Sequence, residues 1–419
     1  MNYLTPLSSG LTLAWDDYGS LGTTAIAFYV HVGSRDENPE LFGAAHFLEH
    51  AVFKGARSWS ARDIANIQDR LGGEINAFTT RDYTVFYAKV LASKAADALE
   101  LLWAMVSEPW LREDDIGKER QVILEELLEA EDDLEDRATE LYMAALYPDE
   151  QFHHDILGSR RSLRQLNAEQ LKNFHRKFYH PDNITLVLSG EGVEELKVLA
   201  ESLRWPHPLG PSITPVRLGP KIGPHIEILS RPGEQVHVTM GVPAPRMFDA
   251  DHDAALVLST ILGGQNSSRL WQRLREDEGL VYTVSASYSA MKDWGELSIY
   301  MAMSPQSVPQ ALEAATQEVM NLLEYGPTEE ERAWALTQAE TAMAFTMETP
   351  DGRMARLGAY AVYGASPLDP KARLSRLEQV SCEQIMRVSR EILAVRPWAV
   401  AACGPVQGLE RVLQTALHA

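Results

Sequence analysis

The stretch that makes the strongest structural demand is Gly43-Ala44-Ala45-His46-Phe47-Leu48-Glu49-His50-Ala51-Val52-Phe53-Lys54. Within it, every residue from 44 to 53 is apolar except His46, Glu49 and His50. A helix that is apolar on nearly all sides is buried, so other layers of the fold must cover it. At about 100° per residue, the three polar side chains fall within an arc of roughly 100°, one above another.

Burying a carboxylate and two imidazoles together is costly unless something compensates them. A divalent cation would do so, with the imidazoles as neutral nitrogen ligands, but it needs a third protein ligand and a position for water. The predicted helix at 113–130 offers two candidates, because Glu119 and Glu126 are seven residues apart and share a face with Val122 and Ile123. Metal ligation by one glutamate with support from the other would account for both.

Three motifs point to a known family. The order His-Phe-Leu-Glu-His at 46–50 is that of the inverted zincins. It is accompanied by Glu-Arg-Gln-Val-Ile-Leu-Glu-Glu at 119–126 and by Gly-Gly-Glu-Ile-Asn-Ala-Phe-Thr at 72–79. The sequence resembles the pitrilysin and insulysin family of zinc peptidases over most of its length, especially short members akin to the mitochondrial processing peptidase β subunit.

The resemblance implies a role for five residues of these motifs. His46, His50 and Glu126 would bind zinc, and Glu119 would be a second carboxylate near the site. Glu49 would be the general base that takes a proton from zinc-bound water. The chemistry agrees, because zinc lowers the pKa of its water towards 7 and a neighbouring carboxylate suits that proton transfer.

The sequence also predicts a duplicated α+β fold. Strand signals at 24–32 and 83–90 recur at 235–242 and 296–303, an offset of about 211–213 residues. Predicted helices lie at 43–54, 92–107 and 113–130 in the first copy, and at 251–262, 305–324 and 328–346 in the second. The expected fold is two tandem domains, each a mainly antiparallel sheet covered by helices, which together form one half of a clamshell.

The boundary between the copies is a stretch rich in proline, which neither a helix nor a central strand can cross. We predict an N-terminal zinc-binding domain at 1–205, a linker at 206–224, and a C-terminal domain without a metal site at 225–419. The second copy has no ligand residues at 257–261, so one zinc ion per chain is expected.

Two residues of the second half resemble a pair that reaches the active site in the family. Arg275 would anchor backbone carbonyls of the substrate, and Tyr282 would donate a hydrogen bond to the tetrahedral oxyanion. Two structural alternatives stay open. Arg275 could form a surface ion pair, and Tyr282 could simply begin a strand.

A substrate-binding strand is predicted at the end of the Gly72–Thr79 motif. An edge strand has unpaired backbone groups to which an extended peptide can add as a further strand. The residues assigned to this role are Asn76, Ala77, Phe78 and Thr79. An ordinary edge strand without substrate is the alternative.

Composition excludes several other classes. The 419 residues include 38 Lys and Arg against 59 Asp and Glu, and a net charge of −21 disfavours nucleic acid and anionic membranes as partners. Two cysteines cannot build a disulfide framework or a thiolate metal site. No secretory leader or membrane-spanning run is evident, so a cytoplasmic protein is expected.

The function that these observations favour is a zinc metalloendopeptidase acting on peptides or unfolded polypeptide segments. The resemblance implies a homodimer closing around a chamber, although a heterodimer with a family paralogue is also open. A non-catalytic assembly subunit is the main alternative, and the retained motif residues weigh against it. A di-iron carboxylate enzyme would need paired Glu-x-x-His motifs, whereas this chain has one histidine-bearing helix in the reverse order.

Overall fold

The computed structural model describes residues 4–19, 22–206, 214–215 and 217–416, which belong to two compact units. The first unit comprises Met1–Leu128, His154–Val216 and Ala342–Leu368, and the second comprises Glu129–His153, Arg217–Thr341 and Asp369–Ala419. In the part of the chain that is described, no helix combines the length and apolar composition needed to cross a membrane.

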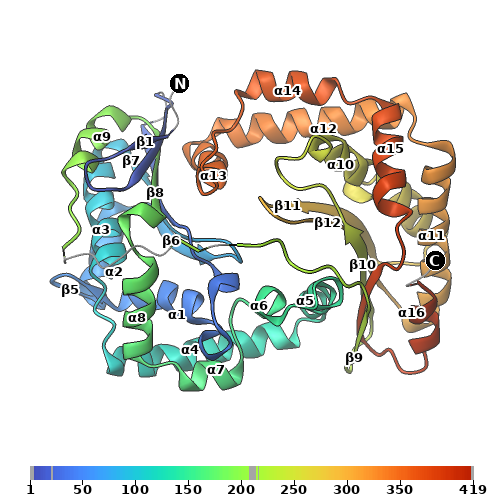
Figure 1. Cartoon of the computed structure of the whole chain (residues 1–419), viewed down its shortest axis with the longest axis horizontal. Helices are drawn as coiled ribbons and strands as arrows, with labels where there is room; N and C mark the ends of the chain where they lie inside the picture. Colours follow the sequence, from blue (N-terminus) through green and yellow to red (C-terminus); the bar gives the residue numbers. More distant parts are fainter. Residues whose placement is uncertain (1–3, 20–21, 207–213, 216, 417–419) are drawn as a thin grey trace. The chain divides into compact units, whose positions relative to one another are not determined.

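The first unit is built on a six-stranded sheet in the order β1-β2-β8-β3-β7-β6 (Figure 1). All neighbouring strands are antiparallel except β2 and β8, and β6 lies at an edge. The strands are β1 Thr5–Pro6, β2 Thr12–Asp17, β3 Thr23–Val30, β6 Glu74–Thr79, β7 Thr84–Leu91 and β8 Ile184–Gly190. A separate two-stranded pair joins β4 Gly55–Ala56 to β5 Trp59–Ser60.

Helices cover both faces of this sheet because its central strand is apolar on both. In β3, Ile26 and Phe28 belong to the core shared with α1, α3 and α8, whereas Ala27 and Tyr29 pack against α13 on the opposite face. The helices of the first unit are α1 Ala44–Ala51, α2 Ala61–Leu71, α3 Ala95–Ser107, α4 Glu113–Asp132, α7 Arg160–Gln165, α8 Ala168–Phe178, α9 Val193–Ser202 and α13 Pro350–Ala361.

The second unit repeats the topology. Its sheet has the order β11-β12-β10-β13-β9, with only β13 and β9 parallel, so β10 takes the place of β3 and β11 that of β6. The strands are β9 Ile226–Ser230, β10 Val236–Pro243, β11 Thr283–Ala290, β12 Gly295–Met303 and β13 Ala399–Gly404. The predicted fold class, mainly antiparallel sheets covered by helices, is confirmed.

Helix α5 covers one face of the second sheet, and α10, α11, α15 and α16 cover the other (Figure 1). The helices of this unit are α5 Leu134–Leu146, α6 Glu150–His153, α10 His252–Ser259, α11 Val308–Tyr325, α12 Glu329–Glu348, α14 Pro370–Glu378, α15 Cys382–Leu393 and α16 Glu410–Ala416. Helices α4 and α12 are divided between the units. The part of α4 up to Leu128 and the part of α12 from Ala342 onward belong to the first unit.

The units differ from the predicted halves in two segments. Residues 129–153, which carry α5, pack with the second sheet, and residues 342–368, which carry α13, pack with the first. Of the predicted linker, 207–213 and 216 lie outside the described residues, and the remainder has no helix or strand. That one duplicated copy ends at 205 and the other begins at 225 stays a prediction.

Most predicted elements are present, and their ends differ. The strand predicted at 24–32 ends at Val30, and the helix predicted at 251–262 ends at Ser259 and continues as a π-helical turn to Gly264. Val122, expected on the buried face of α4, is 51% exposed. The buried stripe of α4 runs through Ile116, Glu119, Ile123 and Leu127, which centres it away from Val122.

A buried carboxyl in the second unit should make stability depend on pH. Glu296 accepts a hydrogen bond from Tyr142 on α5 at 2.9 Å, and burial raises the pKa of Glu296 from 4.5 to about 7. The folded protein therefore holds a proton between these pH values that the unfolded chain releases. The stabilisation is complete below about pH 4.5 and is lost as the pH rises through 7, a change of roughly 3 kcal/mol.

We expect Glu296→Gln to remove this dependence. Urea unfolding of the variant and the unmodified protein at pH 5 and pH 8 measures it, because glutamine does not titrate. Glu313→Gln, on the exposed surface of α11, is the matched control. A free energy of unfolding that falls equally in the protein and the Glu296 variant would contradict the prediction.

Candidate metal centre

The helix α1 presents the histidine motif from a fully packed position. All its residues except His50 are buried, and His50 is partly buried. The helix follows Gly43, whose φ of 90° lies in the left-handed region that glycine adopts without strain. After a 3₁₀ turn it stops at Gly55, where a Cβ would lie 2.3 Å from the ring of Trp110. Both ends of the helix are therefore fixed.

Three side chains converge as the sequence predicts. The candidate ligand atoms of His46, His50 and Glu126 all lie within 4.8 Å of one another. The Nε2 atom of His46 is 3.7 Å from Oε1 of Glu126, and the Nε2 atom of His50 is 3.5 Å from Oε2 of Glu126. Glu126 sits at the edge of the buried stripe of α4, so its side chain is 42% exposed rather than fully buried.

This donor set fits zinc. Burial, and next the neighbouring His50, lower the pKa of His46 to about 3, so its imidazole is neutral at physiological pH, as a metal ligand must be. The Nδ1 atom of His46 is buried and has no hydrogen-bond partner within the described chain. Two imidazoles and one carboxylate are a common protein contribution to a catalytic zinc site with an open position.

Glu119 contacts His50 of the triad and is not itself one of its three residues. Its Oε1 atom lies 2.9 Å from Nδ1 of His50, and its Oε2 atom lies 2.6 Å from Nζ of Lys54. Burial raises the pKa of Glu119, but the hydrogen bonds from His50 and Lys54 outweigh it and leave the pKa lowered. An ionised Glu119 fixes the ring of His50, as carboxylates behind metal-binding histidines do. Lys54 was not predicted, although its place four residues after His50 on one helical face could have indicated it.

Glu49 lies on α1 between the two histidines of the triad. Its side chain is buried, and burial raises the pKa of its carboxyl. The hydroxyl of Thr79, at the end of β6, donates a hydrogen bond to Oε2 of Glu49 at 2.6 Å. The structure thus gives the Thr79 side chain a partner that sequence analysis did not foresee.

The rest of the predicted substrate strand is the edge strand β6. Ala77 is buried, and Asn76 is exposed. Phe78 is 42% exposed and packs edge-on against Tyr83 and Tyr87. One side of β6 pairs with β7, and no strand of the described chain pairs with its other side. Substrate binding along this edge stays a prediction.

Arg275 and Tyr282 lie near each other in the second unit. Arg275, on a π-helical segment, donates a hydrogen bond to the backbone carbonyl of Val281 at 2.9 Å. Tyr282 is 54% exposed and lies just before β11, which begins at Thr283. Its backbone N–H donates a hydrogen bond to the carbonyl of Ala302. Their predicted contribution to the active site stays a prediction.

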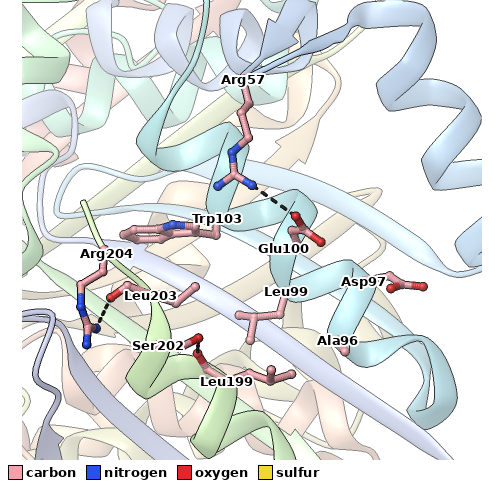
Figure 2. A pocket seen from close by; sticks show the side chains of 10 residues that line it. All are labelled: Arg57, Ala96, Asp97, Leu99, Glu100, Trp103, Leu199, Ser202, Leu203 and Arg204. Carbon is pink, nitrogen blue, oxygen red and sulfur yellow. Dashed lines mark hydrogen bonds and ion pairs between the residues drawn. The ribbon is translucent and has the colours of Figure 1, made fainter. Parts of the chain in front are cut away.

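A hollow elsewhere in the first unit is not the candidate site. This cavity of about 370 Å³ is lined by Arg57, Ala96, Asp97, Leu99, Glu100, Trp103, Leu199, Ser202, Leu203 and Arg204, none of which is a predicted site residue (Figure 2). Arg57 pairs with Glu100 at 3.3 Å, and Arg204 bonds to the carbonyl of Leu203 at 2.7 Å. Its two arginines are thus engaged by the protein itself.

The chain is similar to peptidases of one family. Residues 20–160 match the model of the insulinase family, peptidase family M16, and residues 165–338 match the model described as the peptidase M16 inactive domain. An uncharacterized zinc protease of Streptomyces coelicolor is 32% identical over 414 residues, covering 96% of this chain and 89% of that protein. YmxG of Bacillus subtilis, also named an uncharacterized zinc protease, is 30% identical over 417 residues, covering 95% and 97%.

Solved structures share the fold. A protease from Helicobacter pylori superposes with a TM-score of 0.89 at 20% identity, covering 96% of this chain and 99% of the other. A structure described as the peptidase M16 inactive domain, from Pseudomonas fluorescens, gives a TM-score of 0.88 at 21% identity, covering 96% and 98%. At these identities the likeness concerns the fold alone.

Proposed function

Because the chain belongs to the insulinase family of peptidases, family M16, we propose that it is a zinc-dependent endopeptidase acting on peptides or unfolded polypeptide segments. The observation that carries the proposal is the cluster of His46, His50 and Glu126 with the buried carboxyl of Glu49 on the same helix. One zinc ion per chain is proposed, since this is the only such cluster among the described residues.

In the proposed mechanism the protein's own groups hold the substrate and move the proton. Zinc bound by the triad would polarise the scissile carbonyl and acidify the attacking water. Glu49 takes the proton from that water and passes it to the leaving amine. Its raised pKa suits a group that must both accept and release a proton. Glu119 keeps the ring of His50 oriented throughout.

Substrate would bind as a strand added to β6. Backbone pairing is nearly indifferent to sequence, which suits peptides and unfolded segments. Arg275 and Tyr282 would act on the substrate carbonyl and on the oxyanion, as the family resemblance implies. Assembly as a homodimer and a cytoplasmic location belong to the same proposal.

A non-catalytic or heterodimer-partner subunit is the second candidate. The observation that favours it is that residues 165–338 match a family model described as an inactive domain. The retained His46, Glu49 and His50 argue for the catalytic role.

The deciding experiment is cleavage of an internally quenched, unfolded peptide library by the purified chain, with zinc measured by elemental analysis. We expect cleavage within the peptides, loss of activity with a chelator, and recovery with zinc. A zinc-loaded chain that cleaves nothing would favour the subunit role, and a chain that binds no zinc would refute the metal centre.

The hydroxyl of Thr79 should support Glu49 rather than bind substrate. We expect Thr79→Val to lower kcat about 10- to 100-fold with zinc retained, because a hydrogen bond to a buried charged group is lost. Thr79→Ser keeps the hydroxyl and should restore most of the rate. Steady-state kinetics separate the two roles, since a rise confined to KM would assign Thr79 to substrate binding instead.

A further inference from the structure

The first turn of α1 is capped by a carboxylate from the segment that precedes the helix. Oε2 of Glu37 accepts a hydrogen bond from the backbone N–H of Gly43 at 2.7 Å, and Oε1 accepts one from the N–H of Ala45 at 2.6 Å. The first N–H groups of a helix have no partner inside it, and negative charge is favoured there. Gly43 has no side chain with which to cap the helix. Glu37, which is 1% exposed, performs that role next to His46.

A buried histidine holds this carboxylate in turn. Nε2 of His154 lies 3.1 Å from Oε2 of Glu37, and the ring of His154 stacks on Phe42 with centroids 3.7 Å apart. The guanidinium of Arg81 donates to the backbone carbonyl of His154 at 2.8 Å. Burial raises the pKa of Glu37, and the hydrogen bonds from His154 and the two backbone N–H groups oppose that rise. Three donors thus compensate one buried carboxylate.

The loop that carries His154 also closes over the start of the helix. A Cβ on Gly43 would lie 2.6 Å from the carbonyl oxygen of Leu157, so the two backbones touch. Arg81 follows β6 closely, and the hydroxyl of Thr79 at the end of β6 binds Glu49. The end of β6 therefore contacts α1 directly, through the hydrogen bond of Thr79 to Glu49. It also contacts α1 indirectly, because Arg81 binds the loop of His154 and His154 binds the capping carboxylate of Glu37.

From these contacts we propose that Glu37 and His154 are positioning residues that set the geometry of the metal centre, an inference that rests on the proposed function. Helix α1 has only 8 residues, and His46 lies one position beyond the capped Ala45. The third residue of the triad, Glu126, comes from α4, so a small shift of α1 changes the distances from both histidines to Glu126. Neither positioning residue touches substrate or metal; each acts through the helix.

The test uses Glu37→Gln and His154→Gln in the full chain. Asp16→Asn is the matched control, because the carboxylate of Asp16 pairs with Arg353 at 2.6 Å in the same unit, on β2. The measurements are zinc affinity by competition with a chromophoric chelator, the absorption spectrum of the Co²⁺-loaded protein, kcat and KM, and the thermal midpoint.

We expect zinc affinity and kcat to fall about 10- to 100-fold in both variants, as for other residues that support metal ligands, with KM little changed. The Co²⁺ spectrum should change, because it reports the ligand geometry. Asp16→Asn should leave affinity and spectrum at their original values, even if it lowers the thermal midpoint.

Affinity, spectrum and kcat unchanged in the two glutamine variants would overturn the inference. An equal loss of zinc in Asp16→Asn would also overturn it, because the effect would then follow general stability. If Glu37→Gln shows no cooperative unfolding, His154→Gln decides, since it leaves the carboxylate that caps α1 in place and removes only the imidazole that holds it. A lack of zinc in the unmodified protein would refute the proposed function itself, whereas a zinc-loaded protein with unaffected variants refutes only this inference.

Discussion

Glu49→Gln is expected to abolish peptide hydrolysis while the protein keeps its zinc. Glutamine has nearly the same shape and can still accept the hydrogen bond from Thr79, but it cannot take a proton from water. General-base catalysis contributes about 10²- to 10⁴-fold, so kcat should fall by that factor or more. Stopped-assay cleavage of a quenched peptide, with zinc measured on the same sample, gives both values.

The matched control for this variant is Glu125→Gln. Glu125 is exposed on α4, so the same chemical change there should leave both zinc and kcat at their original values. Residual activity in Glu49→Gln near that of the control would remove Glu49 from the mechanism, and another proton acceptor would have to be sought.

Glu126→Gln is expected to have the second large effect. Unlike Glu49→Gln, it should abolish activity through loss of the zinc. It removes the only carboxylate of the triad, so the zinc affinity should fall by more than the roughly 10- to 100-fold typical of residues behind the ligands. Activity should disappear with the metal and return in part at high zinc concentration. Competition with a chelator and elemental analysis after dialysis provide the measurement.

Glu125→Gln is again the comparison, because it changes the adjacent residue of the same helix. Full zinc occupancy in Glu126→Gln after dialysis would contradict the ligand assignment. Glu119 would then be the next candidate, since it is the other carboxylate in contact with His50.

The sequence predicted the part of the site that local periodicity encodes. Residues three and four apart on a helix share a face, so His46, Glu49 and His50 had to lie together, and the seven-residue spacing brought Glu126 to the same side as Glu119. The same reasoning failed at Val122, because the buried stripe of α4 is narrower than its apolar composition suggests. The duplicated topology was likewise readable from the recurring strands.

The remaining contacts depend on tertiary packing and leave no periodic signal. Glu37 and His154 are 117 residues apart and meet only because two loops converge on the start of α1. The hydrogen bond between Thr79 and Glu49 similarly requires that β6 ends beside the helix. A predicted edge strand does not reveal which of its side chains turns towards the catalytic carboxylate.

The exchange of α5 and α13 between the sheets bears on how the chain acquires its structure. During synthesis, one face of the first sheet, with Ala27 and Tyr29, stays bare until α13 has been made, near residue 361. The first unit therefore exposes an apolar sheet face during most of translation. Helix α5, in contrast, is synthesised before the sheet on which it packs, because the first strand of that sheet begins at Ile226. Each half of the chain thus supplies a helix to the sheet of the other half, so cleavage in the linker would separate each sheet from a helix that covers it only by contacts and no longer by the chain.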